Sequence, residues 1–278
     1  MREIKTREIT GTVARLCLEA NLELPADVLA ALEAAKAEED SPLARDILDQ
    51  LLENAGLARQ EGLPLCQDTG LAVVFVELGR EVTLDGDLVR AVDEGVRQGY
   101  EEGYLRKSVC DPFTRANTGD NTPAVVHLSS VPGDRLKLTV APKGGGSENM
   151  SQLHMLKPAD GWEGCRERII RAVIEAGPNP CPPTIVGVGI GGNFERAAIM
   201  AKEALLRPLG QKNPDPDLAA KEGEVLESLL SSGLGPQALG GRTFSLGVHL
   251  KKEPCHIASL PLAINVQCHA ARHKEAVL

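Results

Sequence analysis

The chain has 278 residues, of which 42% are hydrophobic, 25% charged and only 3% aromatic. This composition is typical of a globular protein, and the length suffices for one large domain or two small ones. The formal net charge of −9, without a basic stripe and with few aromatic rings to stack on bases, argues against a nucleic-acid partner.

The N-terminal sequence predicts neither export nor membrane insertion. Residues 1–17 lack the apolar core of a signal peptide, and the chain contains no run of 18 apolar residues. We therefore expect a cytoplasmic protein whose seven cysteines are reduced. An odd number of cysteines in a reducing compartment is not a disulfide framework, so these residues are candidates for core packing or metal binding.

Helices dominate the start of the chain. Residues 1–58 are expected to be helical, with Ser41 as an N-cap, Pro42 at the first helical position and Gly56 as a stop. The β-rich run over 70–78 is the first predicted strand.

A helix over 85–104 precedes a predicted hairpin. Residues 123–142 alternate between apolar and polar side chains on both sides of a Pro-Gly-Asp turn at 132–134, which indicates two paired strands. The segment "KGGGSEN" (143–149) that follows is interpreted as a loop.

The second half of the chain mixes helices and strands without a regular alternation. We predict helices over 161–177, 193–206 and 218–233, and strands over 183–190, 242–252 and 261–267. No linker or repeat is visible. The fold class is therefore predicted to be α+β, with mixed or antiparallel sheet elements flanked by helices in a single large domain over 1–278.

The stretch Gly187–Gly192 spells G-x-G-x-x-G between a predicted strand and a predicted helix. A dinucleotide-binding loop also needs a second parallel strand that ends in an acidic residue, whereas a proline-broken polar loop follows here. The glycines more plausibly allow close approach of another element or a ligand. With "CQDTG" (66–70) and "KGGGSEN" they suggest one site where backbone amides converge on an anion, or three unrelated turns.

The seven cysteines fall into groups by their surroundings. Cys17 and Cys165 lie on apolar helix faces and are expected in the core. The surroundings of Cys110 and Cys255 favour neither core packing nor metal binding. The remaining three lie in loops beside turn-forming or polar residues: Cys66, Cys181 and Cys268. No C-x-x-C occurs, so a zinc ribbon or a ferredoxin-type site is unsupported. Spacing alone leaves open whether the three loops meet.

Five motifs, "PLCQDTG", "NTGDNTPA", "KGGGSEN", "CPPTIVGVGIGGNFE" and "NVQCHAARH", occur in this order. Together they resemble the α subunit of the class I fumarate hydratases and L-tartrate dehydratases, which are iron–sulfur hydro-lyases. The similarity runs from about residue 8 to the C-terminus. The chain ends shortly after Cys268, so it is similar to the two-subunit form of this family, whose β subunit is a separate polypeptide.

The resemblance implies a [4Fe–4S] cluster held by Cys66, Cys181 and Cys268. Electron-transfer clusters use four thiolates, so a set of three leaves one iron with an open position that can act as a Lewis acid. The implied catalytic and substrate-binding residues are Asp68, His256, Gln67, Arg106, Asn117, Lys143 and Gly145. Taken alone, Asp68 would be a turn residue, Arg106 a surface charge and His256 a solvated loop residue.

The implied reaction is the reversible dehydration of (S)-malate to fumarate, a step of the tricarboxylic acid cycle, with the C3 base supplied by the β subunit. An L-tartrate dehydratase α subunit is the nearer alternative, because both substrates are four-carbon dicarboxylates. A non-catalytic iron–sulfur sensor or regulatory subunit is an alternative of another class. It would leave Gln67, Asp68, Arg106 and His256 without a common purpose.

Overall fold

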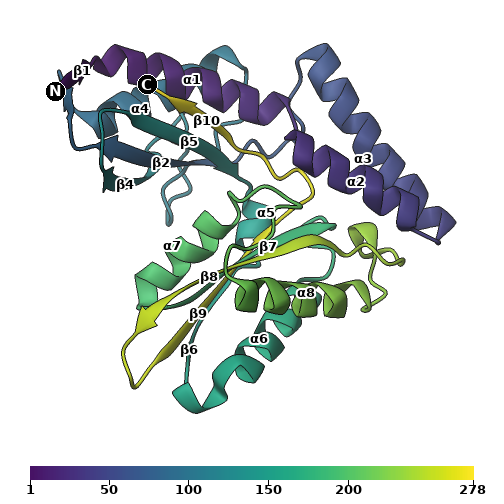
Figure 1. Cartoon of the computed structure of the whole chain (residues 1–278). Helices are drawn as coiled ribbons and strands as arrows, with labels where there is room; N and C mark the ends of the chain where they lie inside the picture. Colours follow the sequence, from purple (N-terminus) through teal and green to yellow (C-terminus); the bar gives the residue numbers. More distant parts are fainter. The chain divides into compact units, whose positions relative to one another are not determined.

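The computed structural model describes residues 1–278 and confirms the α+β class, with three sheets and flanking helices (Figure 1). The chain divides into two compact units, an internal division that the sequence did not predict. The first unit comprises Met1–Leu24, Ala55–Gly145 and Arg272–Leu278, and the second comprises Pro25–Asn54 and Gly146–Ala271. None of the helices combines the length and apolar character that a bilayer crossing requires.

The first unit packs a four-stranded sheet against two helices. Its elements are β1 (Arg2–Ile4), α1 (Thr6–Leu22), β2 (Leu71–Gly79), β3 (Val82–Leu84), α4 (Leu88–Glu102), β4 (Val125–Val131), β5 (Leu136–Lys143) and β10 (Lys274–Val277). The sheet order is β10-β5-β2-β4, and β1 pairs with β3 separately. Apolar side chains of α1 and α4 pack with those of β2 and β5 in one core.

The expected hairpin over 123–142 is wrong, because β2 lies between its two strands. Strand β2 pairs in parallel with β4 and antiparallel with β5. Most of β2 is buried, whereas β4 is largely exposed, so β2 takes the inner position and β4 the edge. The predicted turn still forms, and it caps the end of β2: the amides of Arg80 and Glu81 donate to the carbonyls of Val131 and Gly133.

The helical prediction for residues 1–58 holds from Thr6 onward, but it is wrong for β1 (Arg2–Ile4) and for the stop at Gly56. Helices α2 (Ala26–Glu38) and α3 (Pro42–Glu61) follow α1, and the Ser41 hydroxyl accepts the Ala44 amide as the expected N-cap. Gly56 does not end α3. Its neighbours Ala55 and Ala58 are buried, and this packing outweighs the cost of about 1 kcal/mol for an exposed mid-helix glycine.

The second unit is a four-stranded sheet with helices on both faces. Besides α2 and most of α3, it contains α5 (Gly145–Glu148, beginning at the last residue of the first unit), β6 (Gln152–Leu156), α6 (Gly161–Ala176), β7 (Thr184–Gly192), α7 (Phe194–Ala204), α8 (Pro216–Leu230), β8 (Ser245–Cys255) and β9 (Leu260–Gln267). The order is β6-β9-β7-β8, with β8 parallel to β7 and β9 antiparallel to it. Strands β1, β3, β6 and β10 were not predicted.

The G-x-G-x-x-G string lies inside β7 and packs the strand against α7 (Figure 1). A Cβ atom at Gly187 would lie 2.1 Å from the Ala201 carbonyl oxygen, and one at Gly189 would lie 2.2 Å from that of Ala197. The alternating residues Val186 and Val188 belong to the core with α6 and α8. The dinucleotide-loop alternative is therefore wrong, since these glycines bring a strand and a helix into contact.

A buried carboxylate attaches α2 and α3 to the sheet of the second unit. Glu39 is 2% exposed and accepts the backbone amides of Arg242 and Thr243, the latter at 3.1 Å. Burial works to raise the pKa of this carboxyl, but the backbone amides of Thr243 and Arg242 outweigh it and hold the pKa below its usual range.

Candidate functional site

The loop "CQDTG" is organised around the carboxylate of Asp68. One carboxylate oxygen accepts the Gly70 amide at 3.1 Å, and the other accepts the Gly145 amide at 2.7 Å. The Asp68 amide in turn points at the Cys66 sulfur, 3.4 Å away. The expected turn-forming role of Asp68 is therefore present, and the same carboxylate joins the motifs "CQDTG" and "KGGGSEN".

Glycine is required where these two motifs meet. Gly70 has φ +78°, and a Cβ atom there would lie 2.7 Å from the Lys143 backbone nitrogen. Residues with a side chain rarely adopt this φ, and the neighbouring backbone leaves no room for a Cβ atom, so only glycine fits. The close approach places Lys143, whose residue is 7% exposed, beside the Cys66 loop.

Three buried side chains hold the carbonyls of this loop. The Tyr100 hydroxyl donates to the Thr69 carbonyl at 2.7 Å, with the Gly70 carbonyl at 3.1 Å. The Asn121 side-chain amide donates to the Gly70 carbonyl, and the Arg272 guanidinium donates to the Asp68 carbonyl. Burial raises the pKa of the Tyr100 hydroxyl, so it is a neutral donor at physiological pH. Three segments far apart in sequence thus fix one loop.

The segment that carries Arg106 is tied to the same loop. The Thr69 hydroxyl donates to the Arg106 carbonyl at 2.7 Å, and Asn121 accepts the Ser108 amide at 2.6 Å. The Arg106 side chain is exposed. Asn117 is exposed too, but its amide group bonds the backbone of its own loop on both sides. Asn117 therefore shapes the loop that presents Arg106.

Two of the three loop cysteines lie at one end of the sheet in the second unit. Cys181 precedes β7 and Cys268 follows β9, and the antiparallel register sets Ile185 opposite Gln267. The His269 amide donates to the Cys181 carbonyl at 3.3 Å, which links the two loops directly. Cys181 is exposed, with φ +52°, and the Pro182 carbonyl after it accepts from Gln237.

His256 lies at the opposite end of the same sheet. It occupies the turn between β8 and β9, and its residue is exposed. The eight residues of β9 separate this turn from Cys268, a span of about 25 Å at roughly 3.3 Å per residue. The structure therefore does not bring His256 together with the Cys181 and Cys268 of its own chain, as the expected shared site would require.

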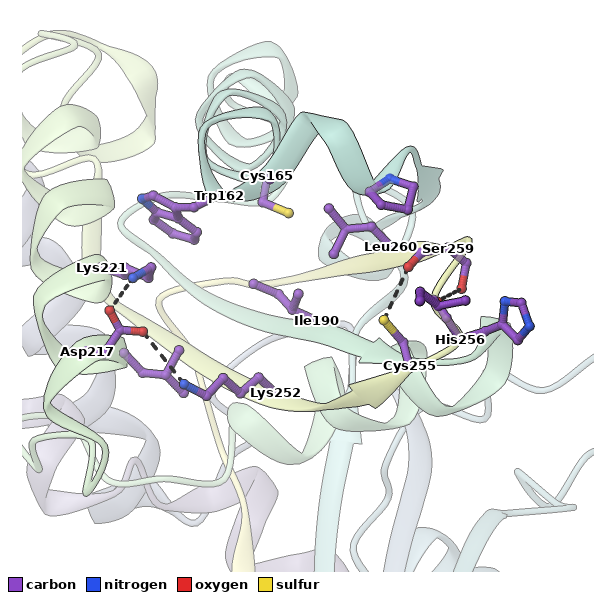
Figure 2. A pocket seen from close by; sticks show the side chains of 14 residues that line it. Trp162, Cys165, Ile190, Asp217, Lys221, Lys252, Cys255, His256, Ser259 and Leu260 are labelled. Atoms are coloured by element: carbon purple, nitrogen blue, oxygen red, sulfur yellow. Dashed lines mark hydrogen bonds and ion pairs between the residues drawn. The ribbon is translucent and has the colours of Figure 1, made fainter.

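A cavity of about 380 Å³ adjoins this turn (Figure 2). Its walls include Trp162, Cys165 and Ile190, while Lys221 and Lys252 at one side both pair with Asp217. Figure 2 shows the His256 ring on the turn, directed away from Trp162 and Cys165. The lining is mainly apolar and its charges are paired, so the cavity does not assemble a set of acid–base groups.

The donor chemistry distinguishes the loop cysteines from the core cysteines. Burial raises the pKa of the Cys17 thiol to about 12 and that of Cys165 to about 11, which disfavours the thiolate that a metal needs. Cys66 instead receives a backbone N–H, the kind of hydrogen bond that stabilises cluster sulfurs. By this criterion the Cys66 loop fits an iron–sulfur ligand.

No group of three His, Cys, Asp or Glu side chains gathers as a metal site within either unit. The expected ligands come from both, with Cys66 in the first unit and Cys181 and Cys268 in the second. The assignment of Cys66, Cys181 and Cys268 as cluster ligands stays a prediction.

Sequence reasoning missed Tyr100 and Arg272 as residues that build the Cys66 loop. Tyr100 is one of only two tyrosines in the chain, and it occupies the buried face of α4, where a hydroxyl needs a partner. Arg272 belongs to the motif "NVQCHAARH", in which the cysteine and the histidines are the residue types typical of metal ligands. Its 5% exposure is visible only in the fold.

A family model described as fumarate hydratase (Fumerase) matches residues 10–277, nearly the whole chain. The chain belongs to this family. A Methanocaldococcus jannaschii protein, provisionally named L(+)-tartrate dehydratase subunit alpha, is 39% identical over 95% of both chains. The L(+)-tartrate dehydratase subunit alpha of Escherichia coli K12 is 31% identical over 95% of this chain and 89% of its own length. The class I resemblance is thereby confirmed, and the family is one of hydro-lyases.

Proposed function

We propose that the chain is the α subunit of a [4Fe–4S]-dependent hydro-lyase that reversibly dehydrates (S)-malate to fumarate, together with a separate β subunit. The observation that carries this proposal is the Asp68 loop. The Asp68 backbone amide there contacts the Cys66 sulfur, and its carboxylate accepts the Gly145 amide of a second family motif. A hydrogen bond from Thr69 attaches the Arg106 segment to the same loop.

Cys66, Cys181 and Cys268 would hold the cluster. When bound with only three thiolates, such a cluster supplies a Lewis-acidic iron that polarises the substrate hydroxyl. The link between the Cys181 and Cys268 loops supports their shared assignment.

The chain's other proposed site residues would bind and orient a dicarboxylate. The exposed Arg106 guanidinium offers two parallel N–H donors to one carboxylate. Gln67, also exposed, offers an amide to the hydroxyl or to the second carboxylate. Asp68, held by two glycine amides, would accept a hydrogen bond from the substrate hydroxyl and so orient it. Lys143 and Gly145 would line the substrate-binding site beside this loop.

If His256 is catalytic, it would act in the active site of another copy of the chain and not in that of its own. The turn that carries it lies about 25 Å from the Cys181 and Cys268 loops of its own second unit, by the length of β9. Co-expression of a His256→Ala chain with a Cys66→Ser chain tests this assignment. Recovered turnover from two inactive variants supports a role in trans, and no recovery, with hetero-oligomers demonstrated, contradicts it.

A second candidate is L-tartrate dehydration, which the names of the relatives favour. The same hydrogen-bonded loop could receive either four-carbon dicarboxylate. The extra hydroxyl of tartrate must be recognised by further polar groups, and those could lie on the β subunit.

The decisive experiment is anaerobic co-purification of the chain with its β subunit, followed by assays with (S)-malate, fumarate and L-tartrate. We expect bound iron and sulfide in equal amounts, and malate turnover by the pair but not by the α chain alone. Preferential turnover of L-tartrate would replace the first candidate by the second. A cluster without turnover of either diacid would favour the sensor or regulatory alternative, and absence of iron would refute the proposal.

A further inference from the structure

Arg272 is a buried cation with only part of its hydrogen-bonding capacity used. The residue is 5% exposed, and one terminal nitrogen donates to the Asp68 carbonyl. Its Nε and its other terminal nitrogen are buried without a hydrogen-bond partner, and no carboxylate forms an ion pair with it. Burying an unpaired charge with unsatisfied donors is costly, so the stability of the fold alone does not explain an arginine here.

A neutral donor does the same structural task one residue further on. Tyr100, fully buried and uncharged, holds the Thr69 carbonyl in the way that Arg272 holds that of Asp68. A hydroxyl or an amide would therefore suffice to fix the loop. What arginine adds is a positive charge beside the peptide that joins Asp68 to Thr69, two residues after Cys66.

The position of Arg272 along the chain is informative as well. It follows Cys268 by four residues, and the carbonyl that it binds belongs to the second residue after Cys66. The hydrogen bond thus connects the loop of one proposed ligand with the segment that leads away from another. Thiolate ligands and a dicarboxylate are all anionic, so an unpaired guanidinium at this point would complement them electrostatically.

We propose that Arg272 is a positioning residue of the hydro-lyase site. Through the Asp68 carbonyl it orients Cys66 and Asp68, and its unpaired charge favours the anionic ligands and substrate. The inference rests on the proposed function for its catalytic consequence, whereas its effect on the loop does not depend on a bound cluster.

The first test uses the full, cluster-free chain and amide hydrogen exchange. In Arg272→Met, exchange of the amides of Asp68 and Gly70 should rise at least tenfold, because both depend on the loop conformation. The control Arg15→Met removes an exposed arginine that pairs with Glu19, and exchange in the loop should not change. Unchanged exchange in Arg272→Met would overturn the positioning role, whether or not the protein proves to be a hydro-lyase.

The second test separates charge from shape in the complex with the β subunit. Arg272→Lys keeps the charge without the planar fork, so iron loading should approach wild type while kcat falls about tenfold. Arg272→Met should lose most of its iron. Equal iron content and equal kcat in both variants and in wild type would refute the electrostatic part. If Arg272→Met does not fold, Arg272→Lys and Tyr100→Phe give the comparison, since Tyr100→Phe should loosen the loop without reducing iron loading.

Discussion

Two glycine-rich regions of this protein use the same residue for different physical reasons. In β7, Gly187 and Gly189 lie where a side chain would point towards α7, and because they have none, the strand and helix backbones come into contact. Around Asp68, Gly70 of the same loop and Gly145 of "KGGGSEN" direct their backbone amides at the Asp68 carboxylate. The glycines of β7 allow close packing between a strand and a helix. The glycines around Asp68 hold a carboxylate in place beside exposed residues of the candidate site.

This difference explains why a glycine motif alone does not assign a function. The string in β7 matches a nucleotide-binding fingerprint by letters, yet it lies within a strand instead of the loop after it. The glycines of "CQDTG" and "KGGGSEN" match no phosphate motif, but they build the candidate site. The element that contains a glycine decides what its missing side chain provides.

Substitution in β7 should have the largest effect on stability. Gly189→Ala places a methyl group against the Ala197 carbonyl of α7, so we expect a loss of at least about 3 kcal/mol in the free energy of unfolding. Urea denaturation followed by circular dichroism measures it. The control Gly223→Ala lies on the exposed face of α8, where nothing stands within 4 Å, and should be neutral or stabilising. Wild-type stability of Gly189→Ala would refute the β7–α7 packing.

A structural carboxylate should respond more moderately, and with a defined pH dependence. Glu39→Gln weakens the bonds to the Arg242 and Thr243 amides, at an expected cost of about 1–3 kcal/mol at pH 7. Because the folded-state pKa of Glu39 is lowered, its carboxylate stabilises the fold above the unfolded-state pKa, near 4.5. That stabilisation is lost as the pH falls through the folded-state value.

The difference in unfolding free energy between wild type and Glu39→Gln should therefore be constant from pH 7 to about pH 5 and shrink below pH 4.5. Asp68→Asn is the matched comparison, because it alters a carboxylate with similar backbone partners at the candidate site. It should lower turnover much more than stability. A difference for Glu39→Gln that grows on acidification would contradict the assigned sign.

The smallest effect on stability is expected at Gly145. A Cβ atom there would meet only the Asp68 carboxylate, at 3.8 Å, and the residue is exposed. Gly145→Ala should change the unfolding free energy by less than about 0.5 kcal/mol. If this glycine lines the substrate pocket, the variant should raise KM for malate in the complex with the β subunit. An unchanged KM would remove Gly145 from the proposed binding residues.

The sequence predicted local elements well and their partners less well. Ser41, Pro42 and the run that became β2 carried their own signals, because caps and alternating side chains are local features. The insertion of β2 between β4 and β5 was not predictable in this way, since pairing depends on which strand buries both faces.

The candidate site shows the same limit. The motifs indicated Cys66 and Asp68, but not the buried Tyr100 and Arg272 that hold their loop, because a buried polar side chain on a helix or near a terminus has no sequence signature. His256 shows the converse. Its catalytic role stays a prediction, and the length of one strand separates it from the Cys181 and Cys268 loops of its own chain.

The most direct measurement of the central claim is the iron and sulfide content of single cysteine-to-serine variants of the anaerobically purified complex. The account predicts that serine at Cys66, Cys181 or Cys268 removes the cluster, while serine at Cys110, the matched loop cysteine of the first unit, leaves it in place. A cluster that persists without any one of the three, or that is lost with Cys110, would contradict the account.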